Sequence, residues 1–285
     1  MIITIDGPAG SGKSSTAREV ARRLGYRHLD SGAFYRALTR ALLDRGIAPD
    51  AWAGLNAAEL DALGVRGVAT PSGYRLEAHG IDLGDRIRAP EVNAHVSAVA
   101  ALPAVREWLL GRLRDAARDG DLVTDGRDMG TVVFPDADLK FFLVATPATR
   151  AGRRLRETGQ DPDLEQSLRA EMARIEARDR ADSERSLAPL RQPDDAELID
   201  TTELSFEEQV ERIVERVRDR DRNREEGASR DPCPQPGPFV IFSRLYPDRI
   251  RSGTASLQPC RRVRRRFVRR NPTHGVPELP QRHDG

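Results

Sequence analysis

Residues 1–16 of the chain read MIITIDGPAGSGKSST. Within them, residues 7–14, GPAGSGKS, match the pattern G-x-x-x-x-G-K-[ST] at every defined position. The isoleucines before the motif predict a strand and residues 13–24 predict a helix after it, which is the context that a phosphate-binding loop requires. Glycines let the backbone wrap closely around a polyphosphate, so that N–H groups and the positive helix end point at the anion. The alternative, a glycine-rich turn that happens to precede a helix, does not explain the spacing.

Lys13 and Ser14 close this motif with the two side chains that polyphosphate chemistry needs. The ammonium group of such a lysine reaches the β and γ phosphates, and the serine hydroxyl is placed to bind Mg²⁺. The chain has 46 basic residues, and only Lys13 and Lys140 among them are lysines. Because arginine fills nearly every other basic position, a lysine where the motif requires one strengthens the assignment.

The bulk composition restricts the class of protein. No run of 18 apolar residues exists, which predicts that nothing spans a membrane, and the N-terminus has no signal-peptide pattern. Both cysteines, Cys233 and Cys260, lie beyond residue 229. The first 229 residues therefore have no disulfide, cysteine nucleophile or cysteine metal site, which is typical of a cytoplasmic protein. Since few long apolar surfaces are visible, we expect a monomer.

The charge is divided unevenly along the chain. Residues 230–285 hold 12 arginines, four acidic residues and nine of the 19 prolines, a net charge of +8, whereas residues 1–229 carry −7. This composition predicts a disordered extension over residues 223–285. Two alternatives stay open for this segment. One is that the segment results from translation of an arginine-rich coding sequence in a shifted reading frame. The other is that the segment is an arm that binds nucleic acid.

Apolar patterning predicts an α/β fold. Five strands at 1–5, 26–29, 122–124, 139–145 and 197–200 are separated by helical patterns, which indicates a parallel five-stranded sheet with crossover helices. Between residues 64 and 89, short strand-like runs are separated by Ser72-Gly73 and His79-Gly80. Such turn dipeptides predict a small antiparallel sheet inserted into the fold. The helices are expected at residues 13–24, 33–45, 91–101, 104–118, much of 150–185, and 205 to about 220.

Three polar clusters are candidates for the functional site: 30–36 (DSGAFYR), 125–130 (DGRDMG) and 178–185 (RDRADSER). The first two begin where predicted strands end, and open α/β sheets bind ligands at that edge. Phosphoryl transfer needs charge neutralisation and positioning more than a strong base. Asp125 lies where an acidic ligand of Mg²⁺ is expected. Each cluster also has an alternative interpretation without a function. The first could be the start of a capped helix, the second a loop with local salt bridges, and the third a surface helix with ion pairs.

Five segments in order, GPAGSGKSS, LDSGAFYR, DGRDMGTVVFPDADLKFFL, RDRADSERSLAPL and ELIDTT, resemble the bacterial cytidylate (CMP/dCMP) kinase family over about residues 1–220. The resemblance implies a P-loop NTPase fold that transfers the γ-phosphate of ATP to CMP or dCMP, with Mg²⁺. It implies a kinase domain over residues 1–222. Within it, residues 31–106 would form the insert that binds the nucleoside monophosphate, and residues 150–166 a helical lid.

The resemblance also implies individual roles. The residues expected to hold the ATP phosphates are Gly7, Pro8, Ala9, Gly10, Ser11, Gly12, Lys13, Ser14 and Ser15. Those expected to stabilise the transferring group are Lys13, Arg127, Arg178 and Arg185. Those expected to bind the acceptor are Ser31, Tyr35, Arg36, Ser97, Arg106, Arg127, Asp128, Arg178, Asp182 and Arg185. Among these, Ser97, Arg106 and Asp128 would read the cytosine edge, where an Asp accepts from the amino group. Ser14 and Asp125 are the expected Mg²⁺ ligands.

Two other functions stay open at this point. The first is a P-loop kinase that acts on UMP, dTMP or shikimate, which a screen of acceptors distinguishes. The second is a nucleic-acid-binding ATPase that uses the basic tail, which would require ATP turnover stimulated by DNA or RNA. His28, His79 and His95 have no partner at metal-ligand spacing, so we interpret them as structural residues.

Overall fold

The computed structural model describes residues 1–230, apart from the side chains of residues 119 and 225–230. Its main sheet has five parallel strands in the order β2-β6-β1-β7-β8. Their bounds are β1 (Ile2–Asp6), β2 (Arg27–Asp30), β6 (Leu122–Gly126), β7 (Leu139–Val144) and β8 (Glu197–Asp200). The predicted α/β fold with a parallel five-stranded sheet is confirmed. The predictions for residues 231–285 lie outside the described residues.

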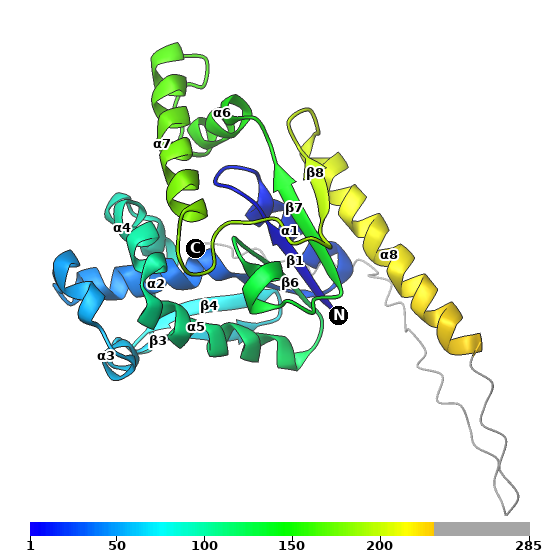
Figure 1. The fold of residues 1–285 in the computed structure, drawn as a ribbon, viewed down its shortest axis with the longest axis horizontal. Coiled ribbons are helices and arrows are strands. Elements are labelled where there is room, and N and C mark those ends of the chain that lie inside the picture. Colours follow the sequence, from blue (N-terminus) through cyan, green and yellow to red (C-terminus); the bar gives the residue numbers. More distant parts are fainter. Residues whose placement is uncertain (231–285) are drawn as a thin grey trace, which may run out of the picture. The chain divides into compact units, whose positions relative to one another are not determined.

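Helices cover both faces of this sheet (Figure 1). The helices are α1 (Lys13–Leu24), α2 (Ser31–Asp44), α3 (Ala57–Ala62), α4 (Pro90–Ala101), α5 (Pro103–Asp115), α6 (Pro147–Glu157), α7 (Glu165–Ser183) and α8 (Phe206–Arg230). Ile3 and Ile5 of β1 pack with Val20 of α1 and Ile213 of α8 in one apolar core. A second core gathers α2, α4 and α5 on the other side. Alternate side chains of β1 point to opposite faces, so Asp6 does not join the core of Ile3 and Ile5.

A small antiparallel sheet is inserted after α3, as predicted. It consists of β3 (Val65–Thr70), β4 (Gly73–Ala78) and β5 (Ile81–Asp82). The β3–β4 turn rests on β2, because the backbone N–H of His28 donates to the carbonyl of Ser72 over 3.3 Å. A Cβ atom at Gly73 would lie 2.5 Å from the carbonyl oxygen of His28. Only glycine therefore permits this close approach.

The last helix begins at the predicted capping box. The backbone N–H of Ser205 donates to Glu208 Oε2 over 2.8 Å, and that of Glu208 donates to Ser205 Oγ over 3.3 Å. The prediction that this helix ends at about Arg220 is wrong, since α8 continues to Arg230. Beyond residue 220, Arg222 pairs with Asp219 one turn before it and Arg224 pairs with Asp138, which supports further helical turns. Within residues 1–230, no helix is long and apolar enough to span a bilayer.

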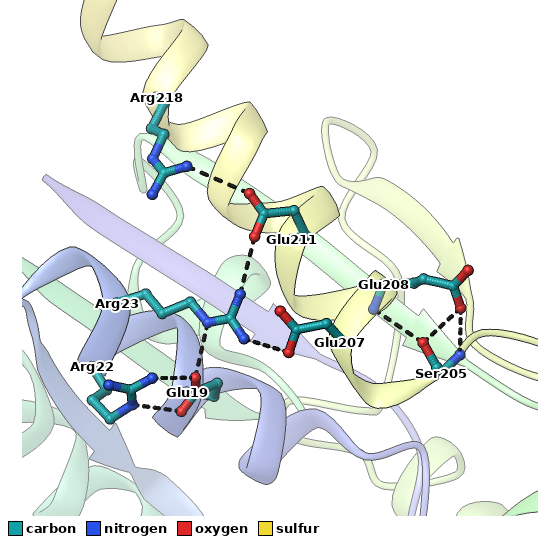
Figure 2. A network of polar contacts seen from close by, with 8 residues as sticks. All are labelled: Glu19, Arg22, Arg23, Ser205, Glu207, Glu208, Glu211 and Arg218. Carbon is teal, nitrogen blue, oxygen red and sulfur yellow. Dashed lines mark hydrogen bonds and ion pairs between the residues drawn. The ribbon is translucent and has the colours of Figure 1, made fainter.

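Ion pairs fasten α8 to α1 beside the core that contains Val20 and Ile213 (Figure 2). The guanidinium group of Arg23 contacts Glu19 at 2.8 Å, Glu207 at 2.6 Å and Glu211 at 3.0 Å. Glu211 also accepts from Arg218 over 3.4 Å. One arginine of α1 therefore binds two successive turns of α8, which keeps α8 against the helix that follows the phosphate-binding motif.

Candidate active site

The phosphate-binding motif forms the turn between β1 and α1. Gly7 has φ +156°, and a Cβ atom there would lie 2.2 Å from the carbonyl oxygen of Leu143. Gly12 caps α1 in the left-handed region, at φ 86°. Lys13 Nζ donates to the carbonyl oxygen of Pro8 over 3.1 Å, so its ammonium group lies across the loop. The loop therefore has the backbone shape and the cation that hold a polyphosphate.

Several cations crowd around Lys13. Its side chain is buried, and burial together with the charge of Arg127 lowers its pKa to about 7. Burial and the charge of Arg127 also lower the pKa of Arg178 to about 10. Within residues 1–230, no group accepts a hydrogen bond from the buried Nε of Arg178. Burial and Arg178 likewise lower the pKa of Arg36 to about 10. A buried excess of positive charge of this kind binds an anion.

Ser14 and Asp125, the two expected Mg²⁺ ligands, are in direct contact. The hydroxyl of Ser14 donates to Asp125 Oδ2. The other oxygen, Oδ1, is 2.8 Å from Nε2 of His28. Burial opposes ionisation of Asp125, but the hydrogen bonds from His28 and Ser14 outweigh it and hold the pKa of this carboxyl below its usual value. The contact with His28 was missed from the sequence, because strand order is needed to place β2 beside β6.

The donor set around Ser14 and Asp125 fits Mg²⁺, which prefers oxygen ligands and keeps several waters. Across the described residues, no group of three or more His, Cys, Asp or Glu side chains is placed to hold a metal. A hydroxyl and one carboxylate are what nucleotide-binding loops of this type supply, while phosphates and water provide the remaining ligands. The residues present are therefore compatible with a metal that arrives with a nucleotide.

A second polar group lies on the opposite side of the sheet from α1, where α5 meets β6. Arg106 forms an ion pair with the buried Asp128 and donates to the carbonyl of Ala100 over 3.0 Å. Its Cζ is 5.8 Å from the ring centroid of Tyr35. Burial raises the pKa of Asp128 despite the neighbouring Arg106. Ser97, half-buried, lies on α4, the helix that supplies the Ala100 carbonyl.

The third predicted cluster closes the site from α7. Asp182 accepts from Arg127 Nε over 2.8 Å and from Arg185 through its other oxygen. Its side chain is buried, yet the charges of Arg127 and Arg185 hold its pKa below the usual value against the effect of burial. Ser31 donates to the backbone carbonyl of Asp125 over 2.7 Å. The structure thus brings residues from all three clusters around the phosphate-binding loop.

Arg36 lies farther out on α2 than this central group. It donates to the side-chain oxygen of Asn93 on α4 and, over 3.5 Å, to the carbonyl oxygen of Ile87. Its pKa is also lowered by the charge of Arg88. Arg36 therefore links α2 to Ile87 and Asn93 within the insert, and its charge faces the same space as that of Arg178.

The sequence patterns did not predict a role for Asp6 in the site. Its Oδ1 accepts from the N–H of Met129 over 3.0 Å, and its Oδ2 accepts from that of Gly130 over 2.7 Å. Burial raises the pKa of Asp6 to about 7. The carboxylate thereby fixes the loop that carries Arg127 and Asp128. Its position at the end of a strand, directly before the motif, is the signal that could have found it.

These features define a class. A parallel α/β sheet, a phosphate-binding loop, paired oxygen donors and a cluster of half-buried arginines are the parts of a P-loop phosphotransferase. The family model described as cytidylate kinase matches residues 3–219. The chain therefore belongs to the cytidylate kinase family, and the resemblance read from its sequence is confirmed.

Individual relatives agree with the family match. The cytidylate kinase of Geobacter sulfurreducens is 44% identical over 216 residues, covering 75% of this chain and 91% of that protein. The cytidylate kinase of Pseudomonas aeruginosa (strain LESB58) is 47% identical over 218 residues, covering 75% of this chain and 93% of that protein. Both are similar to the part of the chain that contains the loop, the insert and the arginine-rich helix.

Proposed function

We propose that this chain transfers the γ-phosphate of ATP to CMP or dCMP, giving ADP and CDP or dCDP, with Mg²⁺ bound beside the ATP. Membership in the cytidylate kinase family supports the reaction and the acceptor. The observation that carries the residue assignments is the excess of cations at the start of α1: burial and the charges of Arg127 and Arg178 lower the pKa of Lys13, and burial and the charge of Arg127 lower that of Arg178. Such a cluster is stabilised by a bound polyphosphate.

The chain's own residues perform most of the reaction by positioning and charge. Residues 7–15 hold the ATP phosphates, and Lys13, Arg127, Arg178 and Arg185 stabilise the charge that spreads over the transferring group. A phosphate oxygen of the acceptor attacks the γ-phosphorus in line, and no general base is needed because a phosphate dianion is already a nucleophile. Mg²⁺ held by Ser14 and Asp125 would neutralise charge on the β- and γ-oxygens when ATP is bound.

The acceptor would lie between the insert and α7. Ser31, Tyr35 and Arg36 hold its phosphate side, and Asp182 accepts from its sugar hydroxyls. Ser97, Arg106 and Asp128 read the cytosine edge. The contacts of Arg106 with Asp128 and with the carbonyl of Ala100, on the same helix as Ser97, support this. A carboxylate that accepts from an amino group and an arginine that donates suit cytosine. In this proposal residues 31–106 form the acceptor-binding insert and residues 150–166 a lid that excludes water.

The other acceptors and the other class of protein are not favoured. UMP, dTMP and shikimate are not the substrates that name this family. The nucleic-acid-binding ATPase depended on the basic tail, and residues 231–285 lie outside the described part of the chain. We keep residues 1–222 as the kinase domain and 223–285 as the extension, although α8 crosses that boundary and ends at Arg230.

The setting of the enzyme is also a proposal. We place it in pyrimidine nucleotide metabolism in the cytoplasm, as a monomer. The small number of exposed large apolar side chains among the described residues supports a monomer; they are Ile81, Leu164, Leu187, Leu198 and Phe206.

A coupled assay of ADP release with MgATP and the full chain tests this function. CMP, dCMP, UMP, AMP, GMP, dTMP and shikimate are offered in turn, and turnover is expected with CMP and dCMP. Lys13→Met and Arg127→Met should lower kcat far more than they raise KM, because their contacts form in the transition state. Arg191→Met, an exposed arginine, is the matched control. Turnover with another acceptor alone, or a pure KM effect, would contradict the proposal.

A further inference from the structure

We propose that His28 is a positioning residue that holds the carboxylate of Asp125 in the orientation needed for Mg²⁺, and that it couples this orientation to the docking of the insert. The inference rests on the proposed metal role of Ser14 and Asp125. It assigns a function to a histidine that sequence patterning alone interprets as structural.

The first observation is the division of the two oxygens of Asp125. Oδ2 faces the hydroxyl of Ser14, and Oδ1 is 2.8 Å from Nε2 of His28. The side chains of His28 and Asp125 are only 9% and 2% exposed, so water does not replace this contact. Because the ring nitrogen of His28 fixes Oδ1 of Asp125, the carboxylate cannot rotate freely. Oδ2 therefore stays directed toward Ser14. Groups that orient a metal ligand in this way commonly change metal affinity or activity 10- to 100-fold when they are removed.

The second observation is on the backbone of the same residue. The N–H of His28 donates to the carbonyl of Ser72 over 3.3 Å, and Gly73 lies against the carbonyl of His28. Ser72 lies in the β3–β4 turn of the insert, and Gly73 is the first residue of β4. His28 of β2 therefore holds two things at once. Its backbone holds the turn at Ser72, on the acceptor side of the enzyme, and its ring holds the carboxylate of Asp125, on the metal side.

The third observation is a cleft of about 810 Å³ lined by α1, β2 and the insert. His28 is one of its lining residues, with Tyr26, Phe34 and Ser72. None of the residues expected to hold ATP or to bind the acceptor lines this cleft. A small molecule can therefore reach the position of a truncated His28 side chain without entering the proposed substrate sites.

Three substitutions in the full chain test the proposal. His28→Phe keeps a ring but removes the hydrogen bond, His28→Gln keeps a side-chain donor, and His28→Ala opens the position to imidazole from the cleft. His79→Asn is the matched control, because His79 lies in the insert at φ 51°, which Asn tolerates, and contacts Arg45 instead of the metal side. Mn²⁺ affinity in the presence of ADP, followed by electron paramagnetic resonance of free Mn²⁺, reports on the site independently of turnover.

We expect His28→Phe to weaken Mn²⁺ binding about tenfold and to raise the Mg²⁺ concentration for half-maximal activity by a similar factor. His28→Gln should retain most of the affinity, and imidazole should restore much of it to His28→Ala. Thermal unfolding of each variant shows whether it is folded. The KM for CMP should also rise in His28→Phe, because loss of the contact with Asp125 lets β2 shift beneath the backbone contact with Ser72; an unchanged KM would overturn the coupling.

Two results would overturn the proposal. One is wild-type Mn²⁺ affinity in a folded His28→Phe. The other is equal weakening in the Phe and Gln variants with no restoration by imidazole, because shape rather than donation would then matter. Asp125→Asn separates this failure from failure of the proposed function. If Asp125→Asn also binds Mn²⁺ like the wild type, Asp125 is not a metal ligand and both proposals fail. If it binds weakly while His28→Phe does not, only the role of His28 is lost.

Discussion

Asp179 accepts a hydrogen bond from the backbone N–H of Ala9 over 2.9 Å, so the arginine-rich helix α7 is tied directly to the phosphate-binding loop. Arg150 of α6 completes the contact, because it forms an ion pair with Asp179 and donates to the carbonyl of Ala9 over 3.0 Å. Ala9 also packs with Ala151 and Ile175 of the same two helices, which lie side by side in Figure 1. The shape of the loop thus depends on α6 and α7.

Asp179→Ala should therefore affect both stability and ATP binding. The substitution leaves Arg150, with its side chain 8% exposed, without its carboxylate partner. Breaking such a buried pair costs about 3 kcal/mol of the free energy of unfolding. We expect a lower midpoint in denaturant unfolding and a higher KM for ATP, with the KM for CMP changed less. Glu176→Ala, an exposed position on α7, is the control. Unchanged stability and unchanged KM for ATP would show that Asp179 does not support the loop.

Sequence patterns predict those structural features that depend on residues close together in the chain. The loop at 7–14, the five strands and the capping box at Ser205 were predicted because each depends on neighbours in sequence. The contact between His28 and Asp125 was missed because it depends on β2 lying next to β6. Asp6 was missed for a related reason: it binds the backbone of residues 129 and 130, and backbone partners leave no mark in the sequence.

Ser97→Ala should weaken the binding of the acceptor CMP without affecting the binding of ATP. Ser97 is half-buried on α4, the helix whose Ala100 carbonyl accepts from Arg106. Loss of one hydrogen bond to the base is expected to raise the KM for CMP about fivefold, which corresponds to about 1 kcal/mol. Steady-state kinetics with CMP and ATP varied separately measure both constants. Ser167→Ala on α7, also half-buried, is the control. An equal rise in the KM for ATP would mean that the substitution disturbs the fold rather than the base contact.

Arg23→Met should loosen α8 in a salt-dependent manner. Arg23 binds Glu19, Glu207 and Glu211, which raises its pKa and keeps it charged at every pH of interest (Figure 2). We expect a lower Tm than that of the wild type at low ionic strength and a smaller difference in about 1 M salt, where the Debye length falls to about 3 Å. Arg22→Met is the control, because Arg22 is more exposed and pairs with Glu19 within α1. A difference in Tm that is independent of salt would point to lost packing of the arginine stem instead.

Nucleotide binding should take up a proton through Lys13. Burial and the charge of Arg127 lower the pKa of Lys13 to about 7, so at pH 8 its side chain is mostly neutral in the free protein. Phosphate oxygens favour the charged form and raise this pKa again, so binding of MgADP should take up a larger fraction of a proton at pH 8 than at pH 6. Calorimetry in buffers of different ionisation enthalpy counts the protons. Lys13→Arg should abolish the uptake, since a guanidinium is charged before and after binding. If that variant takes up as many protons as the wild type at pH 8, another group titrates and Lys13 is charged in the free protein.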